Sequence, residues 1–183
     1  MTSHPVTVLW RGLDPAQPRL EHLHLTPWTR ADGVVVGLED GHPFTLTYRL
    51  EVGPDGHPTR LHLSLRDGRG LTLCRDAAGR WTDSAGQPRP ELGGCTDVDV
   101  QATPLTNTLP IRRLGLEVGE HAVIRAAWVG VPSLEVRAVR QRYTRLAPCL
   151  YRYENLESGF AAEVEVDGAG LVVRYPDAFE RLV

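Results

Sequence analysis

The sequence contains no lysine and only one methionine, the first residue, so all 20 of its Lys and Arg positions are arginine. Set against 23 acidic residues, these give a net charge of −3, which argues against nonspecific nucleic-acid binding because that requires a basic excess. The three cysteines, Cys74, Cys95 and Cys149, are an odd number without CxxC spacing. They suggest neither a disulfide framework nor a zinc ribbon, and we expect free, mostly buried thiols.

Long apolar runs are also missing. No segment approaches the roughly 18 apolar residues that a membrane-spanning helix needs. The first residues, MTSHPVTVLWRG, lack a basic region followed by an apolar signal core. The sequence therefore predicts a cytoplasmic protein that does not span a membrane.

Familiar enzyme signatures are absent as well. The sequence has no H-E-x-x-H, P-loop or dinucleotide glycine pattern, and Ser133 does not stand in a G-x-S-x-G elbow. Cys95 has no histidine close in sequence that would activate it as a nucleophile. His22 and His24 share one strand face but lack further Cys or His ligands nearby. We predict neither a metal ion nor a cofactor.

Alternation of apolar and polar residues dominates what is present. Residues 44–52 and 160–166 alternate with period two, turn signals such as Asp32-Gly33 and Asp40-Gly41 separate such segments, and no helical period of any length stands out. About a dozen short strands and a hydrophobic fraction of 42% over 183 residues predict one all-β domain with a sizeable core.

The predicted domain divides into two halves, residues 1–82 and 95–183, joined by a Pro-, Gly- and Ser-rich surface loop at 83–94. Residues 122–131 are apolar on both faces and predict a central strand. Residues 177–183 predict one helical turn or irregular chain. The segments beginning at Phe44 and Phe160 share an alternating strand, an Asp-Gly turn and a second strand, which suggests an internal duplication or a match that any all-β protein would give.

Residues 93–114 hold the densest polar chemistry of the chain. On a strand, Asp97 and Asp99 would point to one face about 7 Å apart, a spacing that suits an acid and base pair or two ligands of a divalent ion. The structural alternative is that arginines neutralise both carboxylates. Arg112 and Arg113 are predicted to lie on a strand, face opposite sides and therefore have different roles.

This stretch resembles a bacterial family called "putative glycolipid-binding", formerly a domain of unknown function. The resemblance rests on GCTDVD from Gly94, on TNTLPIRRL from Thr106, and on Gln141, Tyr143 and the run Tyr151-Arg152-Tyr153. It implies a strongly curved antiparallel sheet made of two half-barrels, β-roll-like and similar to the folds of lipid and lipoprotein carriers. No catalytic residue follows from it.

Our leading functional hypothesis is a noncatalytic protein that holds a lipid or glycolipid-like amphiphile in a cavity of the curved sheet. Aromatic rings beside amides, guanidinium groups and carboxylates bind sugars and lipid head groups, although core aromatics would give the same composition. The residues expected to contact the ligand are Trp81, Asp97, Asp99, Asn107, Arg112, Arg113, Gln141, Tyr143, Tyr151, Arg152 and Tyr153.

Two alternatives stay open at this point. One is an enzyme that acts on a small polar or sugar substrate through Asp97 and Asp99, as acid and base or with a divalent metal. The other is a partner-binding role in which the loop 83–94 or an exposed strand edge recruits another protein or a second copy. The sequence is compatible with a monomer or a homodimer.

Overall fold

The computed structural model describes residues 5–183, which form one continuous 14-stranded β-sheet. The strands are β1 (Val6–Gly12), β2 (Arg19–Thr26), β3 (Arg30–Glu39), β4 (His42–Val52), β5 (Pro58–Leu65), β6 (Gly70–Arg75), β7 (Trp81–Thr82), β8 (Asp97–Val100), β9 (His121–Val129), β10 (Val136–Ala147), β11 (Leu150–Asn155), β12 (Ala161–Val166), β13 (Val172–Tyr175) and β14 (Phe179–Arg181). Two short helices complete the fold, η1 (Pro90–Leu92) and α1 (Leu105–Leu114). The predicted all-β class is confirmed.

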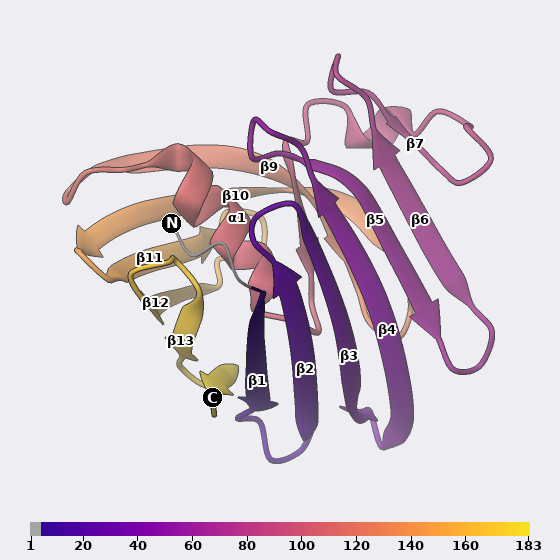
Figure 1. Cartoon of the computed structure of the whole chain (residues 1–183), viewed down its shortest axis with the longest axis horizontal. Helices are drawn as coiled ribbons and strands as arrows, with labels where there is room; N and C mark the ends of the chain where they lie inside the picture. The colour runs from indigo at the N-terminus through magenta and orange to yellow at the C-terminus, as the bar shows by residue number, and fades with distance from the viewer. Residues whose placement is uncertain (1–4) are drawn as a thin grey trace.

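The sheet consists of two seven-stranded halves, each built around an antiparallel meander, which meet where β1 pairs with β14. We call β1–β7 the N-terminal half and β8–β14 the C-terminal half. Every neighbouring pair is antiparallel except β8 and β9, which are parallel because α1 lies between them in the chain. The sheet is strongly curved around α1 but does not close into a barrel, since β7 and β8 are its two free edges (Figure 1). The predicted curved antiparallel sheet is therefore confirmed.

Helix α1 lies in a chain whose sequence showed no helical period of any length, and it replaces the strand expected at Arg112 and Arg113. Seven consecutive residues of the helix, 105–111, are buried, so the segment has no polar stripe that would give it an amphipathic period. Pro110 stands inside the helix, and Thr106 and Thr108 are β-branched, all of which weaken a helical signal in the sequence. Gly115 ends the helix in the left-handed conformation, with φ of 57°.

The N-terminal half follows the predicted alternation closely. In β4 the side chains of Phe44, Leu46, Tyr48 and Leu50 point inward and are buried. The predicted turn at Asp40-Gly41 is confirmed, and both residues have positive φ. The prediction of a turn at Asp32-Gly33 is wrong, because both residues lie inside β3.

Gly33 is needed in the middle of β3 for a different reason. It pairs with Tyr48 across β3 and β4, and a Cβ added at Gly33 would lie 2.2 Å from the Tyr48 ring. The glycine thus marks a close approach between a backbone and an aromatic ring rather than a turn.

Three further segments differ in detail from what the sequence predicted. The loop 83–94 contains the helical turn η1 and a bridge between Thr82 and Pro88, and it joins the two edge strands of the sheet. The predicted central strand at 122–131 is β9, which lies second from an edge. The last residues form the short strand β14 instead of a helical turn.

The hairpins β4–β5 and β12–β13 both exist with their Asp-Gly turns, whereas the duplication inferred from them stays a prediction. Among residues 5–183, no helix combines the length and the apolar character that crossing a membrane requires.

Candidate functional site

Asp99 is the centre of a polar cluster between α1 and the C-terminal half. It lies on β8, and its carboxylate accepts hydrogen bonds from Nε2 of Gln141 on β10 at 2.6 Å and Oγ1 of Thr106 on α1 at 3.3 Å. The hydroxyl of Tyr153 on β11 lies at 3.5 Å, the long limit of a hydrogen bond. Burial raises the pKa of Asp99, and these three donors partly offset that rise.

The cluster continues inward as a chain of hydrogen bonds. Asn107 donates from Nδ2 to the hydroxyl of Tyr143 at 3.0 Å, and that hydroxyl lies 3.4 Å from Oε1 of Gln141. Gln141 in turn donates to Asp99. Because each group donates to the next, the chain fixes the Gln141 amide with its NH₂ toward Asp99.

Aromatic rings pack on the other side of this cluster. Tyr153 lies at the middle, with ring centroids 5.4 Å from Tyr143, 6.2 Å from Phe160 and 6.1 Å from Tyr175. Tyr175 also packs against Phe179, with centroids 6.4 Å apart. Desolvation raises the pKa of Tyr153 and Tyr175, so both hydroxyls remain hydrogen-bond donors at neutral pH.

The polar cluster and the rings line a pocket of about 400 Å³, which we call the aromatic pocket. Its volume falls within the range of about 300–1,000 Å³ that is typical of ligand sites. At its edge the guanidinium of the exposed Arg137 lies 4.3 Å from the Trp128 ring centroid. The lining residues are Asp99, Val100, Gln101, Thr103, Asn107, Trp128, Arg137, Tyr153, Asn155, Ser158, Phe160, Tyr175, Ala178 and Phe179.

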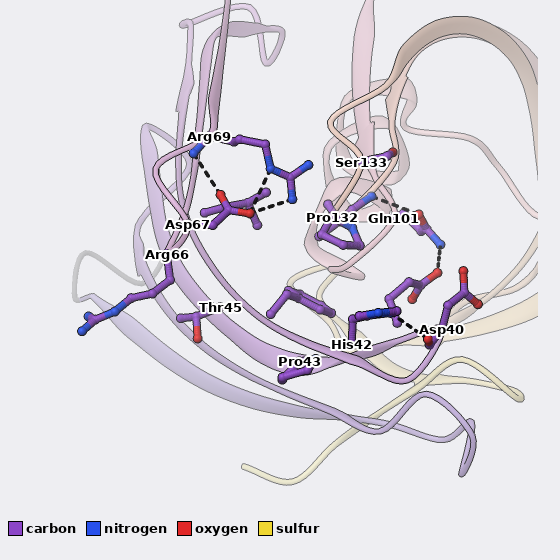
Figure 2. A pocket seen from close by; sticks show the side chains of 14 residues that line it. Asp40, His42, Pro43, Thr45, Arg66, Asp67, Arg69, Gln101, Pro132 and Ser133 are labelled. Carbon is purple, nitrogen blue, oxygen red and sulfur yellow. Dashed lines mark hydrogen bonds and ion pairs between the residues drawn. The ribbon is translucent and has the colours of Figure 1, made fainter.

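A larger groove of about 840 Å³ lies between the N-terminal half and the connection from β9 to β10, and it reaches Gln101 (Figure 2). Asp67 and Arg69, in the turn between β5 and β6, stand on one wall, and Pro132 and Ser133, between β9 and β10, stand on the other. We call this hollow the groove.

Of the predicted site residues, five belong to the cluster just described: Asp99, Asn107, Gln141, Tyr143 and Tyr153. Asp99, Asn107 and Tyr153 line the aromatic pocket, whereas Gln141 and Tyr143 are buried behind them and hold them in place. These side chains come from segments far apart in the sequence. The sequence predicted them as ligand contacts, and the structure shows that they lie together.

Asp97 is placed away from the aromatic pocket, although alternation put it on the same strand face as Asp99. Its carboxylate is 1% exposed and forms an ion pair with Nη2 of Arg113 on α1. Thr96 donates to the same carboxylate oxygen at 2.7 Å. Asp97 and Arg113 therefore hold α1 against β8, which agrees with the structural alternative for this carboxylate.

Arg112 and Arg113 lie on a helix, so the prediction that they face opposite sides of a strand is wrong. Successive helical residues are about 100° apart, and the two side chains diverge by that angle. Arg112 stacks on Trp28 with 3.3 Å between its Cζ and the ring centroid, and it donates to the carbonyl of Ala169 at 2.5 Å. That the two arginines have different roles stays a prediction.

The three remaining residues do not reach the aromatic pocket. Trp81 is buried and donates from Nε1 to the carbonyl of Cys95 at 2.9 Å, which fixes the loop before β8. Tyr151 lines a separate hollow of about 290 Å³ together with Arg112. Arg152 is exposed, with Glu154 3.8 Å away.

Several lining residues escaped the sequence analysis. Phe160, which directly precedes β12, and Phe179, the first residue of β14, meet Tyr175 only after the strands pair. Thr106 was part of the conspicuous polar stretch, but its contact with Asp99 depends on α1, which was not predicted. Gln101 follows β8 directly, and nothing in the pattern distinguishes it from an ordinary loop residue.

The structure also bears on metal and thiol chemistry. Within residues 5–183, no group of three or more His, Cys, Asp or Glu side chains is arranged to hold a metal ion. Burial raises the pKa of the Cys95 thiol, which disfavours the reactive thiolate. His22 and His24 lie on the outer face of β2.

Comparison with known proteins identifies relatives but no activity. Residues 7–181 match the model of the family described as "putative glycolipid-binding". The chain is 42% identical to a DUF1089 family protein from Pseudomonas aeruginosa whose crystal structure was determined at 1.80 Å resolution. The two folds superpose with a TM-score of 0.84 over 90% of this chain and 92% of that one. No curated protein matches the chain.

Proposed function

This chain belongs to the family described as "putative glycolipid-binding", and on that premise we propose that its aromatic pocket binds the sugar-like head group of an amphiphile without transforming it. The observation that carries the proposal is the meeting of Asp99 with several aromatic rings in one pocket of about 400 Å³. Sugars have apolar ring faces and hydroxyl rims, and this pocket offers a partner for each.

The polar side of the pocket is well suited to hydroxyl groups. Asp99 is fixed by Gln141 and Thr106, yet it lines the hollow and keeps acceptor capacity, because a carboxylate has about four lone-pair sites. Asn107 adds an amide, and Tyr153 adds a hydroxyl. Fixed donors and acceptors bind a polar ligand with little reorganisation, which favours affinity.

The apolar side would stack on sugar ring faces. Trp128, Phe160 and Tyr175 line the pocket from three different segments of the C-terminal half. Arg137, which stacks on Trp128, places a positive charge at the edge where a charged head group would meet it. The pocket therefore also suits a head group that carries a carboxylate or phosphate.

Native mass spectrometry of the purified protein mixed with bacterial lipid extracts tests the proposal. We expect an amphiphile to remain bound to the wild-type protein and to be lost or reduced in the Asp99→Asn variant. Loss of one charge-assisted hydrogen bond weakens binding by about 10- to 100-fold. If the wild-type protein retains no amphiphile, the proposal is wrong.

A pair of tyrosine variants separates ligand contact from folding. Tyr153→Phe removes a hydroxyl that lines the aromatic pocket and should weaken binding of the same amphiphile. Tyr151→Phe changes the same strand two residues away, outside that pocket, and should leave binding unchanged. Equal effects of both variants would point to a general loss of structure.

The alternative of an enzyme that uses both aspartates is weakened by their different surroundings. Asp97 is paired with Arg113 and is inaccessible, so only Asp99 could act on a substrate. The raised pKa of Asp99 is the one observation that would suit a general acid. Hydrolysis of aryl glycosides by the wild-type protein but not by Asp99→Asn would favour this alternative.

A further inference from the structure

The hollow of about 290 Å³ that Tyr151 and Arg112 line differs in chemistry from the aromatic pocket. It lies beside the last turn of α1, where Arg112 from the helix and Arg145 from β10 line it together. The turn 167–170 between β12 and β13 forms another wall. None of its lining residues also lines the aromatic pocket. We call it the arginine hollow, a separate place on the C-terminal half.

The side chain of Arg112 is fixed on several sides. Its guanidinium stacks on Trp28, in the turn between β2 and β3, with 3.3 Å between Cζ and the ring centroid. Its Nη1 donates to the carbonyl of Ala169 at 2.5 Å. Its stem passes close to Gly170, where an added Cβ would lie 2.9 Å from Cγ. A guanidinium has five N–H groups, and the bond to Ala169 uses one of them.

Arg145 is likewise oriented by backbone carbonyls. Its Nη1 donates to the carbonyl of Leu116 at 2.7 Å, and its Nη2 donates to the carbonyl of Pro148 at 2.8 Å. Its Nε is buried and has no hydrogen-bond partner among residues 5–183. Carbonyl oxygens hold a guanidinium in place without neutralising it, so Arg145 keeps its full positive charge.

The arginine hollow therefore carries positive charge that the protein itself leaves uncompensated. Within residues 5–183, neither Arg112 nor Arg145 forms an ion pair with a carboxylate, because the hydrogen bonds of both go to carbonyl oxygens. Asp167 is the acidic residue of the lining, and it pairs with Arg181 at 2.6 Å. Partial burial lowers the pKa of Arg112, and the charge of Asp167 offsets part of this change. A bound anion would stabilise both guanidinium groups.

We propose that the arginine hollow binds an oxyanion of the phosphate class through Arg112 and Arg145. Planar guanidinium groups bind phosphate oxygens through paired N–H···O bonds, and two of them balance a divalent anion. The volume of the hollow lies at the lower end of the range for ligand sites, which suits a small ion. The site goes beyond the proposed head-group binding and does not depend on it, since the two hollows share no lining residue.

Inorganic phosphate and the phosphate monoester of a lipid offer the same chemistry, so the test has two arms. The first is titration calorimetry of the protein with inorganic phosphate at low ionic strength. The second is co-sedimentation with phosphatidylcholine vesicles that contain phosphatidic acid. Binding in the first arm alone would identify a soluble phosphate compound as the ligand, and binding to the vesicles would identify a lipid phosphate. If the wild-type protein binds neither, the inference is wrong.

A matched pair of exposed arginines locates the anion. Arg112→Gln should weaken binding by about 10- to 100-fold, because it removes charge-assisted hydrogen bonds to the anion. Arg112→Lys keeps the charge and should weaken binding less. The control is Arg174→Gln, at an exposed position of β13 outside the arginine hollow, which should bind like the wild type. Equal affinities of Arg112→Gln and Arg174→Gln would overturn the inference.

Two further variants test the partner arginine and the neighbouring pocket. Arg145→Gln should weaken binding to a similar extent, and melting curves establish whether it folds without its carbonyl contacts. If it does not fold, the exposed Arg112 decides the question by itself. Loss of binding in Arg137→Gln but not in Arg112→Gln would place the anion at the edge of the aromatic pocket and contradict the inference. Failure of the head-group proposal would leave each of these results unchanged.

Discussion

The two halves of the sheet have the same number of strands but very different interiors. Among the described residues, the N-terminal half buries only two polar side chains, those of Glu21 and Thr72. The C-terminal half and α1 bury six: Asp97, Thr103, Thr106, Asn107, Thr108 and Gln141. Buried polar groups lower stability unless they are paired, so they concentrate where a site needs them. We therefore regard the N-terminal half as the scaffold and the C-terminal half as the location of the site.

The N-terminal half contains one exception to this division. Glu21 is fully buried and accepts hydrogen bonds from Tyr48 at 2.5 Å and Thr103 at 2.7 Å, both on Oε1, whereas Oε2 has no partner among the described residues. Thr103 lines the aromatic pocket, so this carboxyl group connects the scaffold with the site.

The largest effect should come from removing the ion pair that fastens α1 to the C-terminal half. Arg113→Ala leaves the buried Asp97 carboxylate without its cation, and we expect a loss of about 3–5 kcal/mol in the free energy of unfolding. Arg112→Ala removes only the contacts with Trp28 and the Ala169 carbonyl at an exposed position, and should cost about 1 kcal/mol. Urea denaturation measures both, and equal small losses would mean that neither arginine anchors the helix.

The buried carboxyl group of Glu21 should make the stability of the protein depend on pH. Burial raises the pKa of Glu21 from 4.5 to about 7. Between these values the folded protein holds a proton that the unfolded chain releases, so stability should fall as the pH rises from about 4.5 to about 7. The loss amounts to about 3 kcal/mol at most, from about 1.4 kcal/mol per pKa unit.

Glu21→Gln keeps the shape of the protonated side chain but cannot ionise. Denaturation at pH 5 and pH 7.5 should therefore show the loss in the wild-type protein and little of it in the variant. A wild-type slope that persists in Glu21→Gln would assign the titration to another group, with Asp99 as the next candidate because its pKa is also raised.

The tight packing of the scaffold can be tested at Gly33. Gly33→Ala forces a methyl group against the Tyr48 ring, which the hydrogen bond to Glu21 holds in position, and should cost about 2 kcal/mol. Gly168→Ala is the matched control in the C-terminal half, because a Cβ there meets no atom within 4 Å. A melting temperature of Gly33→Ala equal to that of the control would show that Tyr48 can move aside.

The smallest effect should come from the hydrogen-bond chain of the C-terminal half. Tyr143→Phe leaves the buried Asn107 amide without its acceptor and should lower stability by about 1 kcal/mol. It should also weaken ligand binding, because Gln141 loses one of the contacts that orient it toward Asp99. Retained affinity together with reduced stability would limit Tyr143 to a role in packing.

The difference between the two halves also explains which parts of the fold and of the site the sequence alone could predict. In the scaffold, period-two alternation predicted the buried face of strands such as β4 correctly, since side-chain direction on a strand depends only on parity, although the turn expected at Asp32-Gly33 lies inside β3. Parity also placed Asp97 and Asp99 on one face, but it contains no information about neighbours from other strands. Asp97 consequently forms an ion pair with Arg113, whereas Asp99 accepts hydrogen bonds from Gln141 and Tyr153.

The helix was missed because its burial is decided by the sheet that surrounds it. Leu105 to Ile111 are enclosed on all sides, and a segment without a polar face has no amphipathic period. The errors at Arg112 and Arg113, and the failure to place Thr106 beside Asp99, all follow from that single omission. The turn predicted at Gly33 failed because a glycine also serves where a ring approaches the backbone.

The pairing of β1 with β14 has a consequence for how the chain folds. Every other pairing joins strands that follow each other in the chain, whereas this one joins Trp10 to Arg181. Closing so long a loop loses much chain entropy, so each meander should assemble from local contacts before the two are joined. Trp10 reports the last step, because its indole Nε1 donates to the carbonyl of Val172 across the seam at 2.8 Å. During refolding of a variant in which Trp10 is the single tryptophan, its fluorescence should therefore reach the native value later than the circular dichroism of the strands. Simultaneous recovery would mean that the seam forms together with the meanders.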